Sequence, residues 1–172
     1  VNIIEPGDVF IVATNGYFGE RLAEIASRAG AVVYTVDHPV GEPVSAQTIK
    51  AELAKHPVVK GVGVVHAETS TGVITPIAEI AKVVHDAGAL LVVDAVTSLG
   101  GAPLEVDAWD IDVCYSGTQK CLGAPPGLAP ITFGERAVEV MKNRKTKVQS
   151  FYLDMTALND YWQQRVYHHT AP

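Results

Sequence analysis

Asp94 and Lys120 are the residues of this chain whose types and positions could carry covalent chemistry. Asp94 ends one apolar run of strand length, residues 89–94, and Lys120 follows another, residues 111–116. Because neighbouring strands of an α/β sheet end at a common edge, both side chains can emerge there together. A lysine amine condenses with an aldehyde, and a carboxylate can keep an aromatic ring nitrogen protonated. The pair therefore predicts a site for an aldehyde-bearing ring.

Each residue alone also has an ordinary structural interpretation. Asp94 could cap a following turn or helix, and a single loop lysine such as Lys120 is usually solvent-exposed. Here, however, Lys120 stands between an apolar strand and the stiff Gly/Pro-rich loop 121–127. Taken together, the pair matches pyridoxal 5′-phosphate (PLP), in which the amine forms the Schiff base and the carboxylate protonates the pyridine nitrogen.

Apolar runs alternate with amphipathic segments along the chain, which predicts an α/β fold with a mostly parallel sheet and helices on both faces. The expected strands are Val9–Thr14, Ala31–Thr35, Val58–His66, Ala89–Asp94, Ile111–Ser116 and Leu128–Phe133. The expected helices are Phe18–Ala29, Ser45–Lys55, Pro76–Ala87 and Arg136–Asn143. Ser45 is the expected N-cap of one helix, and Gly30 and Gly88 are expected to end two others.

Composition and charge narrow the class of protein. The 172 residues are 48% hydrophobic and 19% charged, which suits one globular domain. The formal charge of -6 argues against a nucleic-acid partner, and no run reaches the ~18 apolar residues of a membrane span. Cys114 and Cys121 form no CxxC pair, so we expect a reducing compartment, the cytoplasm, with an organelle left open.

Five ordered motifs carry a resemblance to a known family. They are residues 15–21 (NGYFGER), 66–72 (HAETSTG), 93–101 (VDAVTSLGG), 116–127 (SGTQK, then APPG) and 167–170 (YHHT). In these motifs the chain resembles the class V aminotransferases of the fold-type I PLP enzymes, and within them the alanine/serine:glyoxylate group. The resemblance implies that residues 1–172 are the PLP-binding large domain, with a sheet of the seven-stranded type. It also implies that an N-terminal segment and a C-terminal small domain lie outside this chain.

The resemblance implies roles around the cofactor ring. Lys120 would be the catalytic, Schiff-base lysine, and Asp94 would hold the pyridine nitrogen. Phe18 would stack on the ring, where many relatives have tryptophan, and Val96 would contact the other face. Without the family, Phe18 and Val96 would be interpreted as core residues.

Further roles concern the polar groups of the cofactor. Thr69 would hydrogen-bond the phenolic oxygen, although a turn hydroxyl explains it equally well. Gln119 would bind the phosphate. Tyr167 and Thr170 would reach the phosphate of a neighbouring subunit, which implies a homodimer with shared sites. A metal cluster at residues 167–170 is not expected, because adjacent histidines point apart and no acidic ligand stands nearby.

The implied activity is PLP-dependent transfer of an amino group from alanine or serine to glyoxylate, giving glycine and a 2-oxo acid. The freed Lys120 would move a proton between the substrate Cα and the cofactor. Ureidoglycine–glyoxylate aminotransferases and cysteine desulfurases remain alternatives, although desulfurases commonly have histidine where Gln119 stands. A non-catalytic dinucleotide-binding α/β domain is disfavoured, since no strand is followed by G-x-G-x-x-G.

Overall fold

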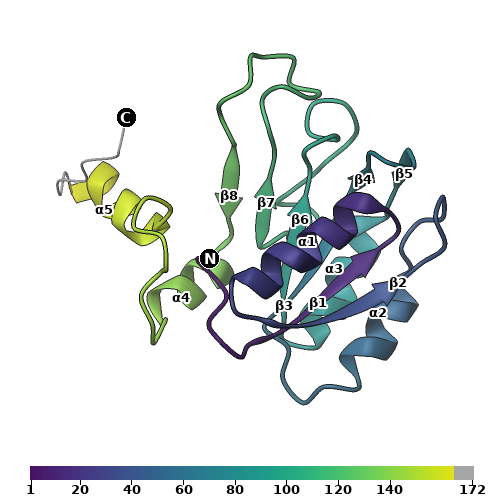
Figure 1. Ribbon diagram of the computed structural model, residues 1–172, viewed down its shortest axis with the longest axis horizontal. Helices are drawn as coiled ribbons and strands as arrows, with labels where there is room; N and C mark the ends of the chain where they lie inside the picture. Colours follow the sequence, from purple (N-terminus) through teal and green to yellow (C-terminus); the bar gives the residue numbers. More distant parts are fainter. Residues whose placement is uncertain (165–172) are drawn as a thin grey trace.

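A six-stranded sheet forms the centre of the computed structural model, which describes residues 1–164 (Figure 1). In the order in which they lie side by side, the strands are β2 (Val32–Asp37), β1 (Val9–Thr14), β3 (Gly61–Val65), β6 (Leu90–Asp94), β7 (Val113–Tyr115) and β8 (Ile131–Phe133). Every pairing is parallel except that of β7 with β8. A separate ladder joins β4 (Ala67–Glu68) to β5 (Val73–Ile74). The mostly parallel α/β sheet is confirmed, with six strands where a seven-stranded type was expected.

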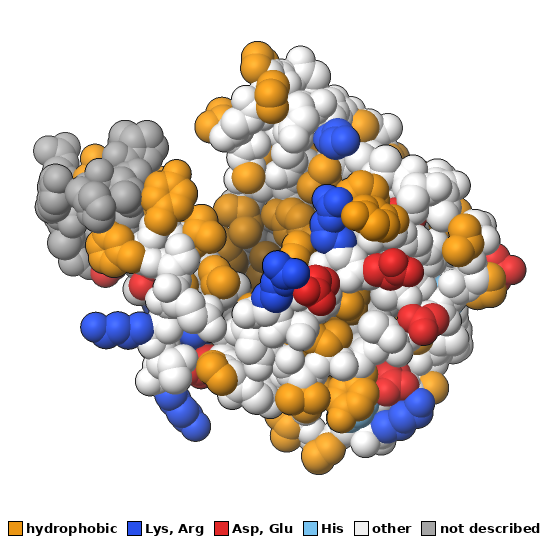
Figure 2. Space-filling model, in the orientation of Figure 1, with side chains coloured by type: hydrophobic (Ala, Val, Ile, Leu, Met, Phe, Trp, Pro, Cys, Tyr) orange, Lys and Arg blue, Asp and Glu red, His pale blue; other side chains and the backbone are white. Residues whose placement is uncertain are grey.

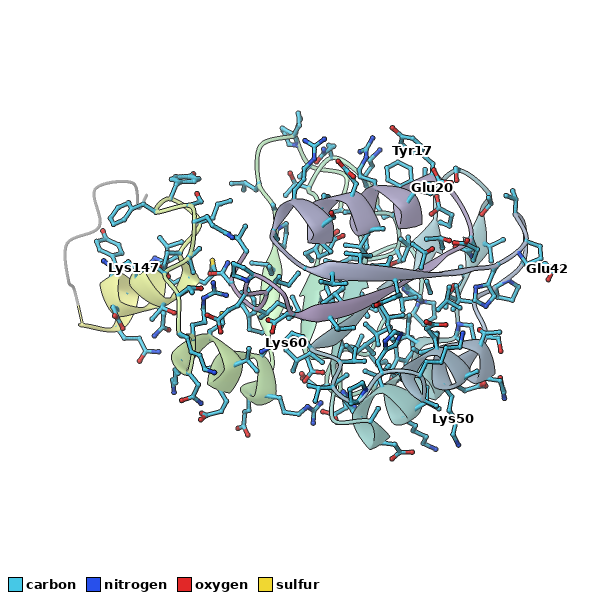
Figure 3. The ribbon with its side chains drawn as sticks, turned by 60° about the horizontal axis from the view of Figure 1, so that its bottom comes forward. Tyr17, Glu20, Glu42, Lys50, Lys60 and Lys147 are labelled. Atoms are coloured by element: carbon cyan, nitrogen blue, oxygen red, sulfur yellow. The ribbon has the colours of Figure 1, made fainter. Side chains whose placement is uncertain are left out.

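Helices cover both faces of the sheet, as the sequence predicts. The helices are α1 (Tyr17–Arg28), α2 (Ala46–Leu53), α3 (Ile77–Asp86), α4 (Glu135–Lys142) and α5 (Met155–Gln164). Ile49 of α2 and Ile80 of α3 lie in the core of one face, whereas Leu22 of α1 and Ala137 of α4 lie in the core of the other. Figure 3 shows α1, with its labelled Tyr17, on the opposite side of the sheet from α2, with its labelled Lys50. No helix within residues 1–164 is long and apolar enough to cross a membrane.

Local sequence signals set most of the element ends. The Ser45 side chain accepts a hydrogen bond from the backbone N–H of Gln47, which confirms the predicted N-cap. Gly30 and Gly88 follow α1 and α3 with φ angles of 102° and 71°, a backbone region that favours glycine. Strand β8 begins at Ile131, later than expected, because the preceding Pro130 has no N–H for a ladder hydrogen bond.

A buried carboxylate ties elements together at the amino ends of β6 and β7. Asp112, 1% exposed, accepts hydrogen bonds from the Leu91 backbone N–H at 2.7 Å and from Arg136 Nε at 2.7 Å. The Nε2 atom of His85 lies 2.9 Å from the same carboxylate. One side chain therefore joins β6, the end of α3 and the start of α4 at the edge opposite the carboxyl ends of the strands.

We expect Asp112→Asn to lower the free energy of unfolding by about 2 kcal/mol, because it takes the charged acceptor away from the buried Leu91 N–H and from Arg136. The substitution places an amide N–H₂ against either the Leu91 N–H or the Arg136 Nε–H, both of which donate hydrogen bonds to Asp112. Urea denaturation followed by circular dichroism measures the change.

The matched control is Asp110→Asn. The Asp110 side chain also contacts Arg136, at 2.9 Å, but is 64% exposed, and asparagine tolerates its φ of 56°. An exposed ion pair contributes less than about 1 kcal/mol. Equal losses in the two variants would show that Asp112 does not hold this edge together.

Candidate functional site

A cavity of about 390 Å³ lies beyond the carboxyl ends of β3, β6 and β7. Its wall includes six of the residues that the sequence predicts as a site: Phe18, Thr69, Asp94, Val96, Gln119 and Lys120. The volume falls within the range of small-molecule pockets, roughly 300–1,000 Å³. The structure therefore brings these six together, whereas Tyr167 and Thr170 lie outside the described residues.

Two of the other hollows in the described chain are instructive to compare with this cavity. One of about 630 Å³ is at the amino ends of the strands, beside His85 and Arg136, and includes none of the predicted site residues. Another, of about 290 Å³, shares Ile25 and Tyr115 with the site cavity and is lined mainly by hydrophobic side chains. Figure 2 shows hydrophobic side chains gathered in the hollow between the body of the protein and its C-terminal part. Of these three hollows in the described chain, the 390 Å³ cavity is the one that combines polar groups with the predicted positions.

Asp94 is held in a fixed orientation at the end of β6. Its Oδ1 accepts the Val96 backbone N–H at 2.9 Å, and its Oδ2 accepts the Tyr115 hydroxyl at 2.8 Å. Burial raises the pKa of Asp94 above its ordinary 3.8, the two hydrogen bonds oppose the shift, and the charge of Glu68 adds to it. Within the described chain no cation pairs with Asp94, so a positively charged or N–H-bearing ligand would stabilise its charged form.

Tyr115 is a site residue that the sequence reasoning missed. Burial and the neighbouring Asp94 charge raise the pKa of Tyr115, which keeps its hydroxyl a hydrogen-bond donor. Its place in an apolar strand gave no functional signal, because an aromatic residue in a strand is ordinary core. Only the parallel pairing of Asp94 with Tyr115 across β6 and β7 reveals the contact.

Lys120 is placed by a loop that folds back on itself. The Thr118 hydroxyl donates to the Pro125 carbonyl at 2.6 Å, and the Ala124 N–H donates to the Thr118 carbonyl at 3.0 Å. The Ser116 hydroxyl fixes the start of the loop by donating to the Ala95 carbonyl at 3.1 Å. No residue of the described chain forms a hydrogen bond or ion pair with the Lys120 amine, which leaves it available to a ligand in the cavity.

The remaining wall comes from α1 and from the segments after β3 and β6. Phe18 stands in the first turn of α1, and the Arg21 guanidinium lies 5.0 Å from its ring centroid. The Thr69 hydroxyl donates to Thr97 Oγ1 at 3.0 Å, and the Thr97 hydroxyl donates to the Ala67 carbonyl at 2.7 Å. Thr69 would have to turn its hydrogen away from Thr97 to donate to a ligand. Arg21 and Thr97 were within recognised motifs, but the sequence gave no sign of these contacts.

Comparisons with known proteins agree with this geometry. A family model described as Aminotransferase class-V matches residues 1–170. Alanine–glyoxylate aminotransferase of Rattus norvegicus is 45% identical over 99% of this chain and 42% of its own length. Among solved structures, alanine–glyoxylate aminotransferase from Nostoc sp. has a TM-score of 0.94 at 47% identity, over 99% of this chain and 45% of that one.

A second solved structure is equally similar in shape. The ureidoglycine–glyoxylate aminotransferase of Bacillus subtilis has a TM-score of 0.94 at 41% identity, over 99% of this chain and 44% of its own. The chain thus spans less than half the length of the relatives it matches. The resemblance based on the five motifs is confirmed, while the choice among these activities is not decided by similarity.

The raised pKa of Asp94 predicts a pH-dependent gain in stability for Asp94→Asn in the cofactor-free protein. A raised folded-state pKa means that stability falls as pH rises from about 3.8 through that pKa, and asparagine avoids this loss. We expect the Tm at pH 7 to rise by roughly 2–4 °C, the effect of about 1 kcal/mol in a domain of this size. The gain should shrink toward pH 4, as measured by calorimetry across this range.

Asp107→Asn is the control, because Asp107 is exposed and lies outside the cavity wall. It should leave the Tm unchanged at both ends of the pH range. A gain for Asp94→Asn that is the same at pH 4.5 and pH 7 would show that burial of the charge is not its cause.

Proposed function

Because the chain belongs to the class V aminotransferase family, we propose that it binds PLP in the 390 Å³ cavity and transfers an amino group from alanine or serine to glyoxylate. The observation that carries the proposal is the convergence of Asp94, Lys120 and Phe18 on one cavity. The glyoxylate part of the proposal is supported by the relatives from rat, Nostoc and Bacillus, all of which are named as glyoxylate aminotransferases.

The chemistry of the cavity wall fits PLP group for group. Asp94 lacks a cationic partner among the described residues, and a protonated pyridine nitrogen supplies one. Lys120 offers an unengaged amine, and Phe18 offers an aromatic face. We assign the ring contact opposite Phe18 to Val96, the phenolic-oxygen contact to Thr69 and a phosphate contact to Gln119.

The proposal extends to residues outside the described part of the chain. Tyr167 and Thr170 would complete the phosphate site of a second subunit, so that the active form is a homodimer with shared sites. The proposed substrates of this homodimer are a small amino acid and a 2-oxo acid.

When bound, PLP supplies an aldehyde that reacts with amines and a ring that accepts the electrons released at the substrate Cα. The residues of the chain supply the remaining steps. Asp94 would keep a proton on the ring nitrogen, while Phe18 and Val96 would hold the ring in place. The freed Lys120 amine would take the proton from the substrate Cα and deliver it to the cofactor carbon that keeps the amino group, because it is the basic group within reach.

Ureidoglycine is a second candidate donor. The Bacillus ureidoglycine–glyoxylate aminotransferase matches the fold as well as the Nostoc alanine–glyoxylate enzyme does, with TM-scores of 0.94 for both. A panel of alanine, serine and ureidoglycine with glyoxylate, followed by glycine formation, separates the candidates. Transfer from ureidoglycine alone would replace the alanine/serine proposal.

We expect purified protein with added PLP to show a visible absorbance band that borohydride removes by fixing the cofactor covalently to Lys120. Lys120→Ala should lack the band and slow glycine formation by about 10²–10⁴-fold, the usual contribution of a general acid–base. Peptide mass spectrometry after reduction identifies the modified lysine.

Lys50→Ala is the matched control, because Lys50 is an exposed lysine on α2, on the opposite side of the sheet from α1 (Figure 3). This variant should keep both the band and the activity. Labelling of Lys50 instead of Lys120, or a folded parent without any band, would contradict the proposed site.

A further inference from the structure

The N-terminus of α1 lacks a cap from its own sequence. Gly16 occupies the N-cap position and has no side chain to accept a hydrogen bond from the first turn. The first backbone N–H groups of a helix need such acceptors when they are withdrawn from water. Phe18, the aromatic wall of the cavity, stands within this turn, so its position depends on whatever satisfies these groups.

Glu68, distant in sequence, supplies the missing acceptor. Its Oε2 accepts the backbone N–H of Phe18 at 3.1 Å and that of Gly19 at 3.2 Å. Its Oε1 accepts the backbone N–H of Ser70 at 3.1 Å and the Ser70 hydroxyl at 2.7 Å. The Ser70 oxygen in turn accepts the Tyr17 backbone N–H at 3.1 Å. Three successive amides of α1 are thus capped from the β4 segment.

Glu68 is fully buried and has no cationic partner in the described chain, which is unusual for a glutamate. Its exposed fraction is 0%, and no lysine, arginine or histidine of the described chain forms an ion pair with it. Every contact of its two oxygens is with a donor, so the carboxylate is balanced by N–H groups and the positive end of the helix. Gly16 is required for this approach, because a Cβ there would lie 2.5 Å from the Glu68 Cγ.

The segment that contains Glu68 also contributes Thr69 to the wall of the cavity. Thr69 follows Glu68 directly, and its hydroxyl is tied to Thr97, which is tied to the Ala67 carbonyl. Phe18 and Thr69 therefore belong to two elements that are joined by one buried side chain. Movement of Glu68 would change the distance between them and with it the shape of the cavity.

We infer that Glu68 is a positioning residue for the cofactor: it fixes Phe18 on α1 relative to Thr69, which directly follows β4, and so sets the geometry in which the ring is held. This inference rests on the proposed function for its ligand. Glu68 itself would contact neither the ring nor the substrate. It would act on the proposed site through the backbone amides of Phe18 and Gly19.

The first test uses cofactor-free protein and does not depend on PLP. In Glu68→Gln one acceptor oxygen becomes an N–H₂ group that faces a donor and the negative charge is lost, so the cap is weakened with little change of volume. We expect hydrogen exchange at the Phe18 and Gly19 amides to speed up by about tenfold or more, measured by NMR, with exchange in β1 unchanged. Glu79→Gln, an exposed first-turn glutamate of α3, should leave these amides as they are.

The second test separates positioning from loss of stability. We expect the PLP dissociation constant of Glu68→Gln to rise about tenfold and the visible circular dichroism of the bound cofactor to change, measured well below the Tm. Asp112→Asn is the stability-matched control, because it destabilises the fold at the opposite edge of the sheet. It should keep both the dissociation constant and the dichroic band of the parent.

Ser70→Ala provides a graded variant if Glu68→Gln folds poorly, since it removes one donor and the Tyr17 acceptor while keeping the carboxylate. Its dissociation constant should rise less than that of Glu68→Gln. An unchanged constant in both Glu68→Gln and Ser70→Ala, or an equal rise in Asp112→Asn, would overturn the inference. A parent that binds no PLP overturns the proposed function instead, and the exchange rates of the Phe18 and Gly19 amides then decide whether Glu68 positions this turn.

Discussion

The register of β3, β6 and β7 is the constraint on which the site depends. Val65 pairs with Asp94, and Asp94 pairs with Tyr115, so these three residues lie side by side at the carboxyl end of the sheet. A slip of one residue in β6 would turn Asp94 to the opposite face and bring a valine into its place. The core prevents this slip, because Leu91 and Val93 are fully buried on the face covered by α2 and α3. Packing of apolar residues therefore decides where the carboxylate stands.

Two buried carboxylates and one partly buried carboxylate of the described chain are compensated in different ways. Asp112 has a cation, Arg136, at 2.7 Å, and Glu68 has four donated hydrogen bonds within 3.2 Å at a helix N-terminus. Asp94 has two hydrogen bonds and a nearby negative charge, and burial raises its pKa. Asp94, the least compensated of the three, lies in the cavity wall, where a ligand can supply the cationic or N–H partner that the described chain does not provide. The two better compensated ones hold elements together.

Local patterns in the sequence predicted the elements whose causes are local. Strand β1 has its expected bounds, and Ser45, Gly30 and Gly88 act as expected, because periodicity and backbone preference act over a few residues. The β4–β5 ladder was missed because two-residue strands show no period, and α5 was missed as well.

The supporting contacts of the site could not be predicted in this way. The cap of α1 joins Phe18 to Glu68, and the support of Asp94 comes from Tyr115, on a different strand. Such contacts exist only once the sheet has formed, and no spacing in the sequence marks them. The motifs indicated which residues line the cavity, whereas the structure shows what holds them there.

The charges around the cavity narrow the class of ligand. Although the chain has a formal charge of -6, the described wall of the cavity carries two cations, Arg21 and Lys120, and one acid, Asp94. The Arg21 guanidinium lies 5.0 Å from the ring centroids of both Tyr17 and Phe18, so its charge is held at the N-terminal end of α1. An anionic ligand with one protonated ring nitrogen satisfies all three charges at once. A neutral or cationic ligand would leave the wall with two cations and a single acid, so the wall favours an anionic ligand, such as one that carries a phosphate or a carboxylate.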